Sequence, residues 1–491
     1  MQNNLDNFTI KLPAKLKDVL EKMNKNLKGL VFVIDNKNRL IGSISDGDVR
    51  RSIINNSIKN IINLKSKFIN FKPFFLNYKI ETKTILNYLQ NEKNKNKFKC
   101  IPLVNEKKVI IDISTIENLR RYPITNLSLG NTEFRNVLNA MKSGWISSSG
   151  SYVTQFEKAF SKYIGGGYSV TTSSGTTALE LALKSFEIGI GDEVLVPNFS
   201  FAASINSIIN VGAKPVVVDI DQTTWTIDLE ELQKKITIKT KAIMPVHIYG
   251  QPCKMNEIVK IARSNRIYVI EDAAEALGAT YYKKKIGLNG DCSCFSFYAN
   301  KIITTGEGGM VLYKKKNKIR IANLIKNHGM DKKRPYYHTK VGNNYRMTNI
   351  QAAIGLGQLE KINKFIKLRK KIFINYNKRF QNYNFFNLLP NNNWSTNSYW
   401  LYTVVIKKIG RSKRDLLIKK LIKHGIDTRP GFVNFNKMKI YKKFCKGSYK
   451  NSEYISANSI SLPSSHIDES QQNFIATTFI KELHKIYKYE E

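Results

Sequence analysis

Lys301 is the residue whose type and surroundings point most directly to chemistry. It lies in the segment CFSFYANKIITTGEGGMV, residues 294–311, which holds no other basic residue. Ser296 precedes this lysine, a Gly- and Thr-rich turn follows it, and upstream Asp272 ends the apolar run IYVIED, a pattern typical of a strand. A lysine that can bond covalently to an aldehyde, together with a carboxylate that can keep a pyridine nitrogen protonated, is the minimum set for a pyridoxal-phosphate (PLP) enzyme.

The two residues need opposite electrostatic settings for that chemistry. The amine of Lys301 is a nucleophile only when it is deprotonated, and burial beside a cationic ring lowers its pKa from the usual value of about 10.4. Asp272 must stay ionised, because its negative charge keeps the ring nitrogen protonated and makes the ring an electron sink. For either residue alone, a surface lysine beside a hairpin or an aspartate that caps a helix is the plain alternative.

A third pattern, TTSSGTTALELAL, indicates a phosphate site. Ser173, Ser174, Gly175 and Thr176 stand between an expected strand at 169–172 and the helix that follows. The free N–H groups and the positive dipole end of a helix N-terminus bind anions. Many ordinary helices also begin with such residues. The indication therefore comes from chain order, in which the phosphate loop precedes the carboxylate and the carboxylate precedes the lysine.

An α/β domain is expected to position these residues. The apolar, β-branched runs SVTT, EVLVPN, PVVVDI, KAIMPVHIYG and IYVIED alternate with amphipathic stretches such as TTALELALKSF and LEELQKKI. Continuous apolar strands that alternate with helices predict a mostly parallel sheet that is covered on both faces. We expect a PLP-binding large domain at 124–365 and a small C-terminal α/β domain at 366–491.

Residues 1–123 predict a separate module. The stretch GLVFVIDNKNRLIGSISDGDVRRSII indicates strand, turn, strand and helix, and KFKCIPLVNEKKVIIDISTIENLRR repeats the pattern up to a helix start. Two such β-β-α units in tandem resemble a pair of cystathionine-β-synthase-type (CBS) domains. That resemblance implies that Ser45 and Asp48 hold the ribose of an adenine nucleotide, whereas the second copy lacks this spacing. A purely structural or dimerising module stays open.

The composition fits a folded protein that is not built for nucleic acid. Of 491 residues 42% are hydrophobic and 11% aromatic, and the formal net charge is +41. The excess is mostly lysine, spread along the whole chain among Asn and Ile, with no Arg-rich arm. We therefore expect no nucleic-acid partner, while anionic small molecules such as a sugar nucleotide suit this charge.

Targeting and metal signals are missing from the sequence. No apolar run approaches the roughly 20 residues needed to span a bilayer, and the start of the chain lacks the apolar stretch of a signal peptide. Five cysteines are scattered without a CxxC pair. These observations predict no membrane association, no metal and a reducing cytoplasmic location.

The longer motifs carry a family resemblance over residues 125–490. Four segments resemble motifs of the DegT/DnrJ/EryC1/StrS family of sugar aminotransferases: SFYANKIITTGEGG, EDAAEALGA, GWISSSGSYVTQFE and GNNYRMTNIQAAIG. Within it, EDAAEALGA, PVHIYGQP and NYRMTNIQAAIGLGQLE look most like GDP-perosamine synthases. The resemblance implies the type I aminotransferase fold, PLP as cofactor, and a homodimer with two active sites at the subunit interface.

The resemblance also assigns roles around the cofactor. It makes Lys301 the lysine that holds PLP covalently and Asp272 the partner of the pyridine nitrogen. It places the phosphate on Ser296, Gly175 and Thr176.

Three further residues match positions of the family motifs. Phe201 matches the aromatic residue that stacks on the pyridine ring, although an ordinary core phenylalanine is the alternative. Asn344 matches the residue that reaches the phosphate from the neighbouring subunit, and Glu275 falls near the ring hydroxyl and the substrate.

The implied reaction moves an amino group from glutamate to the C4 ketone of GDP-4-keto-6-deoxymannose, giving GDP-perosamine for surface polysaccharide such as O-antigen. By this resemblance, Arg429 occupies the Arg-Pro position of the family near the mouth of the site. His247 is a second candidate for contact with the substrate. The alternative for His247 is a buried histidine whose hydrogen bonds are satisfied within the protein. After Arg429 the family continues with aromatic, Pro and His residues, whereas this chain reads GFVNFNKM, so the sugar stays open.

Three alternatives remain at this stage. The substrate could be a UDP- or dTDP-linked keto sugar. A sugar dehydratase of the same fold has histidine in place of the lysine, so Lys301 argues against it. A non-enzymatic, nucleotide-sensing regulatory protein would not need Ser296, Asp272 and Lys301 together.

Overall fold

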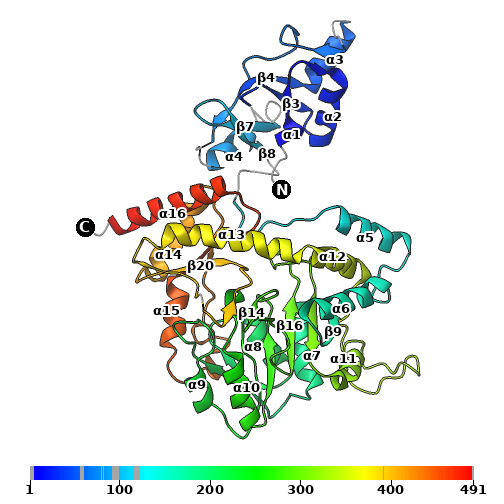
Figure 1. Cartoon of the computed structure of the whole chain (residues 1–491), viewed down its shortest axis with the longest axis vertical. Helices are drawn as coiled ribbons and strands as arrows, with labels where there is room; N and C mark the ends of the chain where they lie inside the picture. Colours follow the sequence, from blue (N-terminus) through cyan, green and yellow to red (C-terminus); the bar gives the residue numbers. More distant parts are fainter. Residues whose placement is uncertain are drawn as a thin grey trace. The chain divides into compact units, whose positions relative to one another are not determined.

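The computed structural model describes residues 5–55, 60–78, 80, 82–90, 99–115, 122–390 and 392–488. It divides into two compact units, Met1–Pro123 with Lys419–Asp427, and Ile124–Ile418 with Thr428–Glu491 (Figure 1). No helix in these described ranges is long and apolar enough to cross a membrane.

The N-terminal unit contains the same small sheet twice. In the first sheet β1 (Thr9–Lys11) runs parallel to β3 (Leu30–Ile34), which pairs antiparallel with β4 (Leu40–Ser45). In the second, β6 (Leu76–Asn77) runs parallel to β7 (Cys100–Val104), which pairs antiparallel with β8 (Ile110–Thr115). The tandem β-β pattern of the sequence is therefore present. The helix start expected after β8 lies outside the described residues.

The helices of this unit flank the sheets. They are α1 (Leu5–Phe8), α2 (Leu16–Asn26), α3 (Asp46–Ile54) and α4 (Thr82–Gln90), and a short pair joins β2 (Ala14–Lys15) to β5 (Ile61–Ile62). Val19 and Met23 on the inner face of α2 pack with Val31 and Val33 of β3. This cluster forms because the apolar positions of α2 recur at helical spacing while β3 is apolar throughout.

The larger unit is built on a seven-stranded sheet with the strand order β11-β10-β12-β13-β16-β17-β9. The bounds are β9 (Tyr168–Thr172), β10 (Glu193–Pro197), β11 (Lys214–Val218), β12 (Thr240–Ile243), β13 (Tyr268–Asp272), β16 (Cys292–Ser296) and β17 (Gly309–Tyr313). β10, β11, β12, β13 and β16 pair in parallel, and β17 is antiparallel to both of its neighbours. The expected mostly parallel sheet is confirmed.

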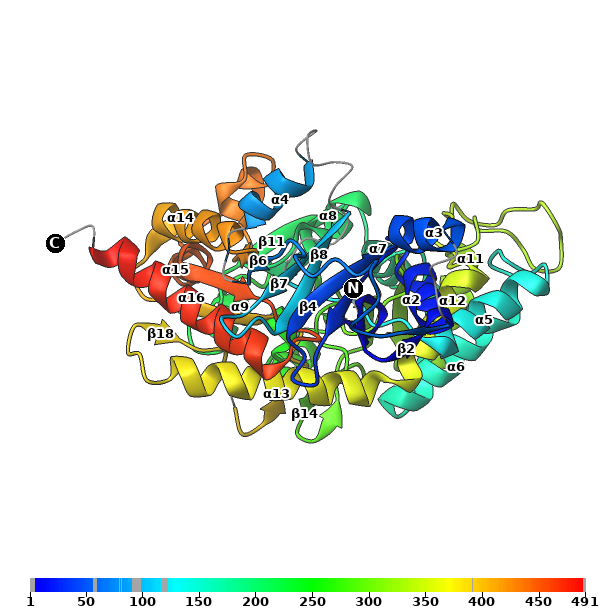
Figure 2. The same ribbon diagram turned by 90° about the horizontal axis from the view of Figure 1, so that it is seen from above.

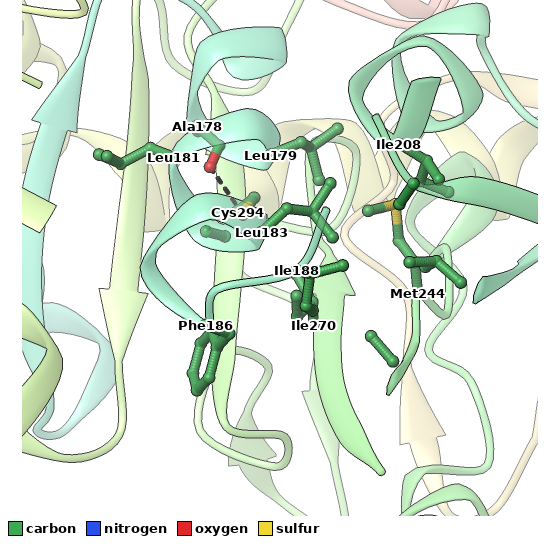
Figure 3. Close-up of a cluster of buried hydrophobic side chains, with 14 of the residues drawn as sticks. Ala178, Leu179, Leu181, Leu183, Phe186, Ile188, Ile208, Met244, Ile270 and Cys294 are labelled. Carbon is green, nitrogen blue, oxygen red and sulfur yellow. Dashed lines mark hydrogen bonds between the residues drawn. The ribbon is translucent and has the colours of Figure 1, made fainter. Parts of the chain in front are cut away.

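Helices lie on both faces of this sheet (Figures 1 and 2). They are α5 (Asn131–Lys142), α6 (Ser151–Ile164), α7 (Gly175–Ser185), α8 (Ala202–Asn210), α9 (Leu229–Lys234), α10 (Met255–Ser264), α11 (Ile319–Ile325) and α12 (Asn349–Glu360). Figure 3 shows the core under α7, where Leu179 and Leu183 lie near Ile270 of β13 and the thiol of Cys294 on β16 hydrogen-bonds the Ala178 carbonyl. Packing α7 on the sheet aims its N-terminus at the ends of the strands that carry Asp272 and Ser296.

A second, smaller sheet lies near the C-terminus. Its antiparallel order is β18 (Phe386–Asn387), β20 (Tyr402–Ile406), β22 (Ser459–Leu462) and β21 (Arg429–Pro430). The helices α14 (Gly410–Lys423), α15 (Lys450–Asn458) and α16 (Glu469–Lys488) belong to the same stretch of chain, and a three-stranded sheet joins β14 (Thr280–Tyr281), β15 (Lys284–Lys285) and β19 (Ser395–Thr396). The long helix α13 (Ile362–Phe380) runs across the division expected at 365.

Candidate active site

Lys301 lies in the loop after β16 with its amine buried. Its side chain is only 14% exposed, and Nζ lies 4.0 Å from the Glu275 Oε1 and 4.0 Å from the centroid of the Trp400 ring. Burial lowers the pKa of Lys301, while the nearby carboxylates of Glu275 and Asp272 oppose that shift. A buried lysine with a lowered pKa is an amine that can act as nucleophile and base.

Asp272 ends β13 and is buried as well. Ser204 Oγ of α8 donates a hydrogen bond to Oδ2 at 2.7 Å, and the backbone N–H of Ala274 donates to Oδ1 at 3.2 Å. Burial raises the pKa of Asp272, against the effect of these hydrogen bonds and of Lys301. A cationic ring nitrogen beside this carboxylate would offset the cost of burying its charge.

Glu275 is the second buried carboxylate near the amine. The backbone N–H of Tyr249 donates to its Oε2 at 2.6 Å. Burial raises the pKa of Glu275 to about 7, against the lowering effect of Lys301. A carboxyl group with a pKa of about 7 beside an amine whose pKa is lowered can exchange protons with it near neutral pH, which is what acid–base chemistry needs.

The N-terminus of α7 forms a cradle beside these groups. Ser174 caps the helix by accepting a hydrogen bond from Thr177 N, and the first-turn N–H groups of Gly175 and Thr176 have no acceptor within the helix. A Cβ on Gly175 would lie 2.8 Å from the Cβ of Ser296. Glycine is therefore required for the Ser296 hydroxyl to stand at this N-terminus, where anions bind.

Aromatic rings continue from the lysine toward the surface. Trp400 stacks on Tyr249 with centroids 6.2 Å apart, and Tyr249 stacks on Phe432 at 5.4 Å. Phe432 meets Phe201 edge-on at 6.2 Å, and Phe201 is 61% exposed. An exposed ring at the start of α8 is free to stack on a planar cofactor, so the reading of Phe201 as an ordinary core residue does not fit its exposure.

The buried carboxylate, the anion cradle and the exposed ring together fit a phosphorylated pyridine. The structure thus brings Lys301, Asp272, Glu275 and Ser296 together with the N-terminus of α7. Sequence reasoning missed Trp400, Tyr249 and Ser204. Tyr249 stands in the quoted motif PVHIYGQP, and Ser204 ends the segment PNFSFAAS that contains Phe201, but no sequence pattern marked Trp400.

Other candidates lie apart from the amine. His247 is fully buried, with Nε2 3.0 Å from Glu271 Oε2 and Nδ1 accepting a hydrogen bond from Cys253 N. Because Glu271 and Asp272 are neighbours in one strand, their side chains point to opposite faces of the sheet, and His247 does not face the site. Arg429 lies exposed in β21, with Nη1 bound to the Thr428 carbonyl.

Asn344 is exposed and accepts a hydrogen bond from Arg346 Nε. Its neighbour Tyr345 accepts one from the backbone N–H of Ser173 at 2.9 Å, which holds this segment beside the cradle.

In the N-terminal unit, Ser45 and Asp48 bond mainly to each other. Ser45 Oγ donates to Asp48 Oδ2 at 2.5 Å, and the pair forms a capping box at the start of α3. Burial would raise the pKa of Asp48, but the hydrogen bonds from Ser45 and Arg51 lower it. Their observed role is to cap the helix.

Comparison with known proteins agrees with this geometry. A profile of the DegT/DnrJ/EryC1/StrS aminotransferase family matches residues 128–479, and a CBS-domain profile matches residues 4–55. The chain belongs to this aminotransferase family. It is a PLP-dependent sugar aminotransferase with an N-terminal CBS domain, as the sequence motifs had predicted.

Individual relatives cover most of the larger unit. The GDP-perosamine synthase of Caulobacter vibrioides is 42% identical over 349 residues, which are 71% of this chain and 94% of that protein. The GDP-perosamine synthase of Escherichia coli O157:H7 is 41% identical, over 66% of this chain and 88% of its own. The solved structure of the putative sugar aminotransferase Spr1654 from Streptococcus pneumoniae, in its PLP form, is 29% identical with a TM-score of 0.71, and covers 74% of this chain and 99% of its own.

Proposed function

We propose that this protein moves an amino group from glutamate to the C4 ketone of GDP-4-keto-6-deoxymannose, and so makes GDP-perosamine for surface polysaccharide. The observation that carries the proposal is the buried amine of Lys301 beside Asp272 and Glu275. The choice of sugar is supported by the 42% and 41% identity to two GDP-perosamine synthases.

The bound PLP supplies an electron sink for the reacting carbon. Asp272, which accepts a hydrogen bond from Ser204, would keep the ring nitrogen protonated, and Phe201 would stack on the ring. Ser296 and the first-turn N–H groups of α7 would hold the phosphate.

Lys301 then carries protons. As a base it removes the proton from the carbon of the donor that bears the amine, and as an acid it returns a proton to C4 of the sugar. The lowered pKa of Lys301 and the raised pKa of Glu275 bring the two groups toward a common range. Glu275 therefore balances the charge of the amine while Lys301 changes its protonation.

We also propose that the protein works as a homodimer in which Asn344 reaches the phosphate of the neighbouring site. Support comes from an apolar stripe on α5 and just after it, where Phe134, Leu138, Met141 and Trp145 are each at least 50% exposed. Their spacing puts them on one helical face. A second copy of the chain would cover this exposed apolar stripe and would also complete an active site shared by two subunits.

Arg429 is proposed to bind the diphosphate of the sugar nucleotide or the carboxylate of glutamate, because a guanidinium suits both anions. The N-terminal unit is proposed to bind a nucleotide, in keeping with its CBS match. A cytoplasmic location is proposed because all five cysteines are free, which suits a reducing compartment.

The test is an incubation of the purified protein with glutamate and a panel of GDP-, UDP- and dTDP-linked 4-keto-6-deoxy sugars, followed by mass spectrometry. We expect an amino sugar from the GDP-linked mannose derivative and stoichiometric 2-oxoglutarate. If only a UDP- or dTDP-linked sugar is aminated, the proposed aminotransferase activity stands and the proposed GDP-linked substrate is wrong. No amination of any sugar by the PLP-loaded protein would refute the proposal.

A further inference from the structure

His247 is a buried polar residue that the proposed mechanism does not use. Its ring lies on the face of the large sheet away from Lys301, with Nε2 3.0 Å from Oε2 of Glu271, and both side chains are fully buried. The backbone N–H of Gly290 donates to the other oxygen of Glu271 at 2.7 Å. Burying such a pair costs free energy that an apolar pair would not cost, which points to a role beyond packing.

The hydrogen bonds of His247 define its protonation state. The backbone N–H of Cys253 donates to Nδ1 at 3.0 Å, so Nδ1 carries no proton and Nε2 donates its own to Glu271. Burial lowers the pKa of His247, whereas Cys253 and Glu271 raise it, to about 10 in sum. A second proton would nevertheless sit on Nδ1 and face the N–H of Cys253. The observed hydrogen bond to Nδ1 therefore belongs to the neutral ring.

The bond between His247 and Cys253 closes a loop with an uncommon backbone conformation. Tyr249, inside this loop, has φ 48° and ψ 25°, a left-handed conformation that is unfavourable for a residue with a Cβ. Gly250 follows with φ 82° and donates its N–H to the His247 carbonyl at 3.2 Å. Backbone strain of this kind persists only where surrounding contacts hold it, and it clusters at functional sites.

The loop is also held where it leaves the sheet. The backbone N–H of Asp272 donates to the Pro245 carbonyl at 2.9 Å, and the N–H of His247 donates to the Asp272 carbonyl at 3.0 Å. The loop therefore starts from a fixed point beside Asp272, and the His247 ring fixes its other end at Cys253. With both ends held, the residues between them keep the strained turn.

This turn contacts both groups that surround the Lys301 amine. The backbone N–H of Tyr249 donates to Oε2 of Glu275 at 2.6 Å, and the Tyr249 ring stacks on Trp400 with centroids 6.2 Å apart. Lys301 Nζ lies 4.0 Å from Glu275 Oε1 and 4.0 Å from the centroid of the Trp400 ring. A change in the turn would therefore reach the amine through the carboxylate and through the indole.

We propose that His247 is a positioning residue of the active site, which holds the Tyr249 N–H on Glu275 by closing the loop 247–253. Glu271 supports this role because it keeps the ring proton on Nε2 and leaves Nδ1 free to accept the bond from Cys253. The inference rests on the proposed function, in which Glu275 balances the charge of the Lys301 amine.

The electrostatic consequence can be followed from the groups that face Glu275. Burial raises the pKa of Glu275 to about 7, Lys301 and the Tyr249 N–H act against this rise, and Asp272 adds to it. Without the N–H the pKa of Glu275 rises further, so less of this carboxyl group is ionised near neutral pH. Burial lowers the pKa of Lys301, and Glu275 opposes that effect. Opening the loop should therefore lower the pKa of Lys301.

Two substitutions separate the two hydrogen bonds of the ring. Oδ1 of Asn lies as many bonds from Cα as Nδ1 of His does, so His247→Asn can still accept the Cys253 N–H. Nε2 of Gln matches Nε2 of His in the same way, so His247→Gln keeps a donor for Glu271 and loses the acceptor for Cys253. Only the second variant should open the loop.

Ser293→Ala is the matched control for a buried hydrogen bond elsewhere in the sheet. Ser293 pairs with Glu271 in the neighbouring strand, is fully buried, and donates to the Gly287 carbonyl at 2.8 Å. Its loss removes a hydrogen bond close to Glu271 without touching the loop 247–253. Glu275→Gln is the positive control, since it removes the carboxylate itself.

The measurement is the reaction of Lys301 with an amine reagent across pH in the full-length, cofactor-free protein. Mass spectrometry follows the peptide that contains Lys301, at a temperature where circular dichroism shows every variant folded. We expect His247→Gln to lower the apparent pKa of Lys301 by about half a unit or more, and Glu275→Gln to lower it at least as far. His247→Asn and Ser293→Ala should leave it unchanged.

Hydrogen exchange of the unaltered protein provides a second measurement that needs no variant of His247. The amides of the peptide 247–253 should exchange as slowly as those of β13, because the closed loop protects them. This measurement keeps the proposal testable if His247→Gln does not fold.

Three results would overturn the proposal. The first is an equal shift of the Lys301 titration in His247→Gln and His247→Asn, or a shift in neither of them while Glu275→Gln shifts it. The second is fast exchange of the peptide 247–253 in the unaltered protein. The third is an unchanged titration in Glu275→Gln, which would refute the charge balance by Glu275 as well. The amination of a sugar is measured separately and stands or falls independently of all three.

Discussion

The amine of Lys301 lies 4.0 Å from the centroid of the Trp400 ring, and hydrogen bonds hold both the ring and the backbone of Trp400. Trp400 Nε1 donates to the Asn300 carbonyl at 2.8 Å, and the buried Arg369 donates to the Trp400 carbonyl at 2.6 Å. A fixed indole face stabilises a nearby ammonium group. It therefore opposes the effect of burial on the pKa of Lys301.

Replacing this ring should change the titration of the lysine. We expect Trp400→Leu to lower the pKa of Lys301 by about half a unit or more, since a cation–π contact contributes about 0.5–1 kcal/mol or more. The measurement is the pH dependence of the reaction of Lys301 with an amine reagent in cofactor-free protein. The control is Trp394→Leu, because Trp394 packs on Tyr281. Equal titration curves in both variants would show that the contact has no electrostatic effect.

Removing the amine itself should abolish turnover while the fold persists. We expect Lys301→Ala to lose the visible absorbance of lysine-bound PLP and all amination, with a melting temperature close to that of the unaltered protein. Lys301→Arg keeps the charge and cannot form the covalent link, so it should be equally inactive. The exposed Lys316 provides a control as Lys316→Ala. Retained amination by Lys301→Ala would contradict the mechanism.

Asp272 should matter far more to turnover than Ser45. Asp272→Asn removes the charge that keeps the ring nitrogen protonated, and we expect a loss of turnover on the order of a hundredfold or more, about 3 kcal/mol. Ser45→Ala removes one helix cap, at about 1 kcal/mol of stability, and should leave turnover nearly unchanged. Steady-state kinetics with saturating PLP checks the ranking, and similar losses in both variants would reverse it.

Glu275 should make the stability of the cofactor-free protein depend on pH. Its pKa is about 7 in the folded protein against an ordinary 4.5. The folded state therefore holds a proton that the unfolded state releases, and stability falls as the pH rises from about 4.5 to about 7. We expect Glu275→Gln to remove a part of this fall, on the order of 2 kcal/mol. Urea titrations across that pH range, with Glu257→Gln as control, measure it, and parallel curves would exclude the effect.

The apolar stripe on α5 should hold two chains together. Phe134→Asp or Leu138→Asp places a charge in the proposed interface, and we expect either variant to sediment as a monomer with impaired PLP binding, because Asn344 would no longer reach the neighbouring site. The control is Ile238→Asp, since Ile238 is 98% exposed and lies outside the stripe. If the stripe variants leave the sedimentation coefficient unchanged, the dimer interface does not lie at this stripe.

Local patterns were sufficient to predict a large part of this protein. The parallel strands follow from continuous apolar runs, and Asp272 could be placed at a strand end because such a run stops at a polar residue. No strand was predicted for β16, so the position of Ser296 at its end came from the structure. The start of α7 was predictable because Ser174 and Gly175 are helix-start residues. His247 could not be placed in this way, because a strand-end histidine has two faces of the sheet available and the sequence does not say which face it takes.

By itself the sequence determined the order of lysine, carboxylate and phosphate loop, the family, and the repeat in the N-terminal unit. Each of these can be read from short local motifs and from their order along the chain. Only the tertiary structure decided that the Trp400 ring lies over the Lys301 amine and that Ser204 hydrogen-bonds Asp272. The physical reason is that such contacts join residues far apart in sequence, and their positions depend on how whole elements pack together.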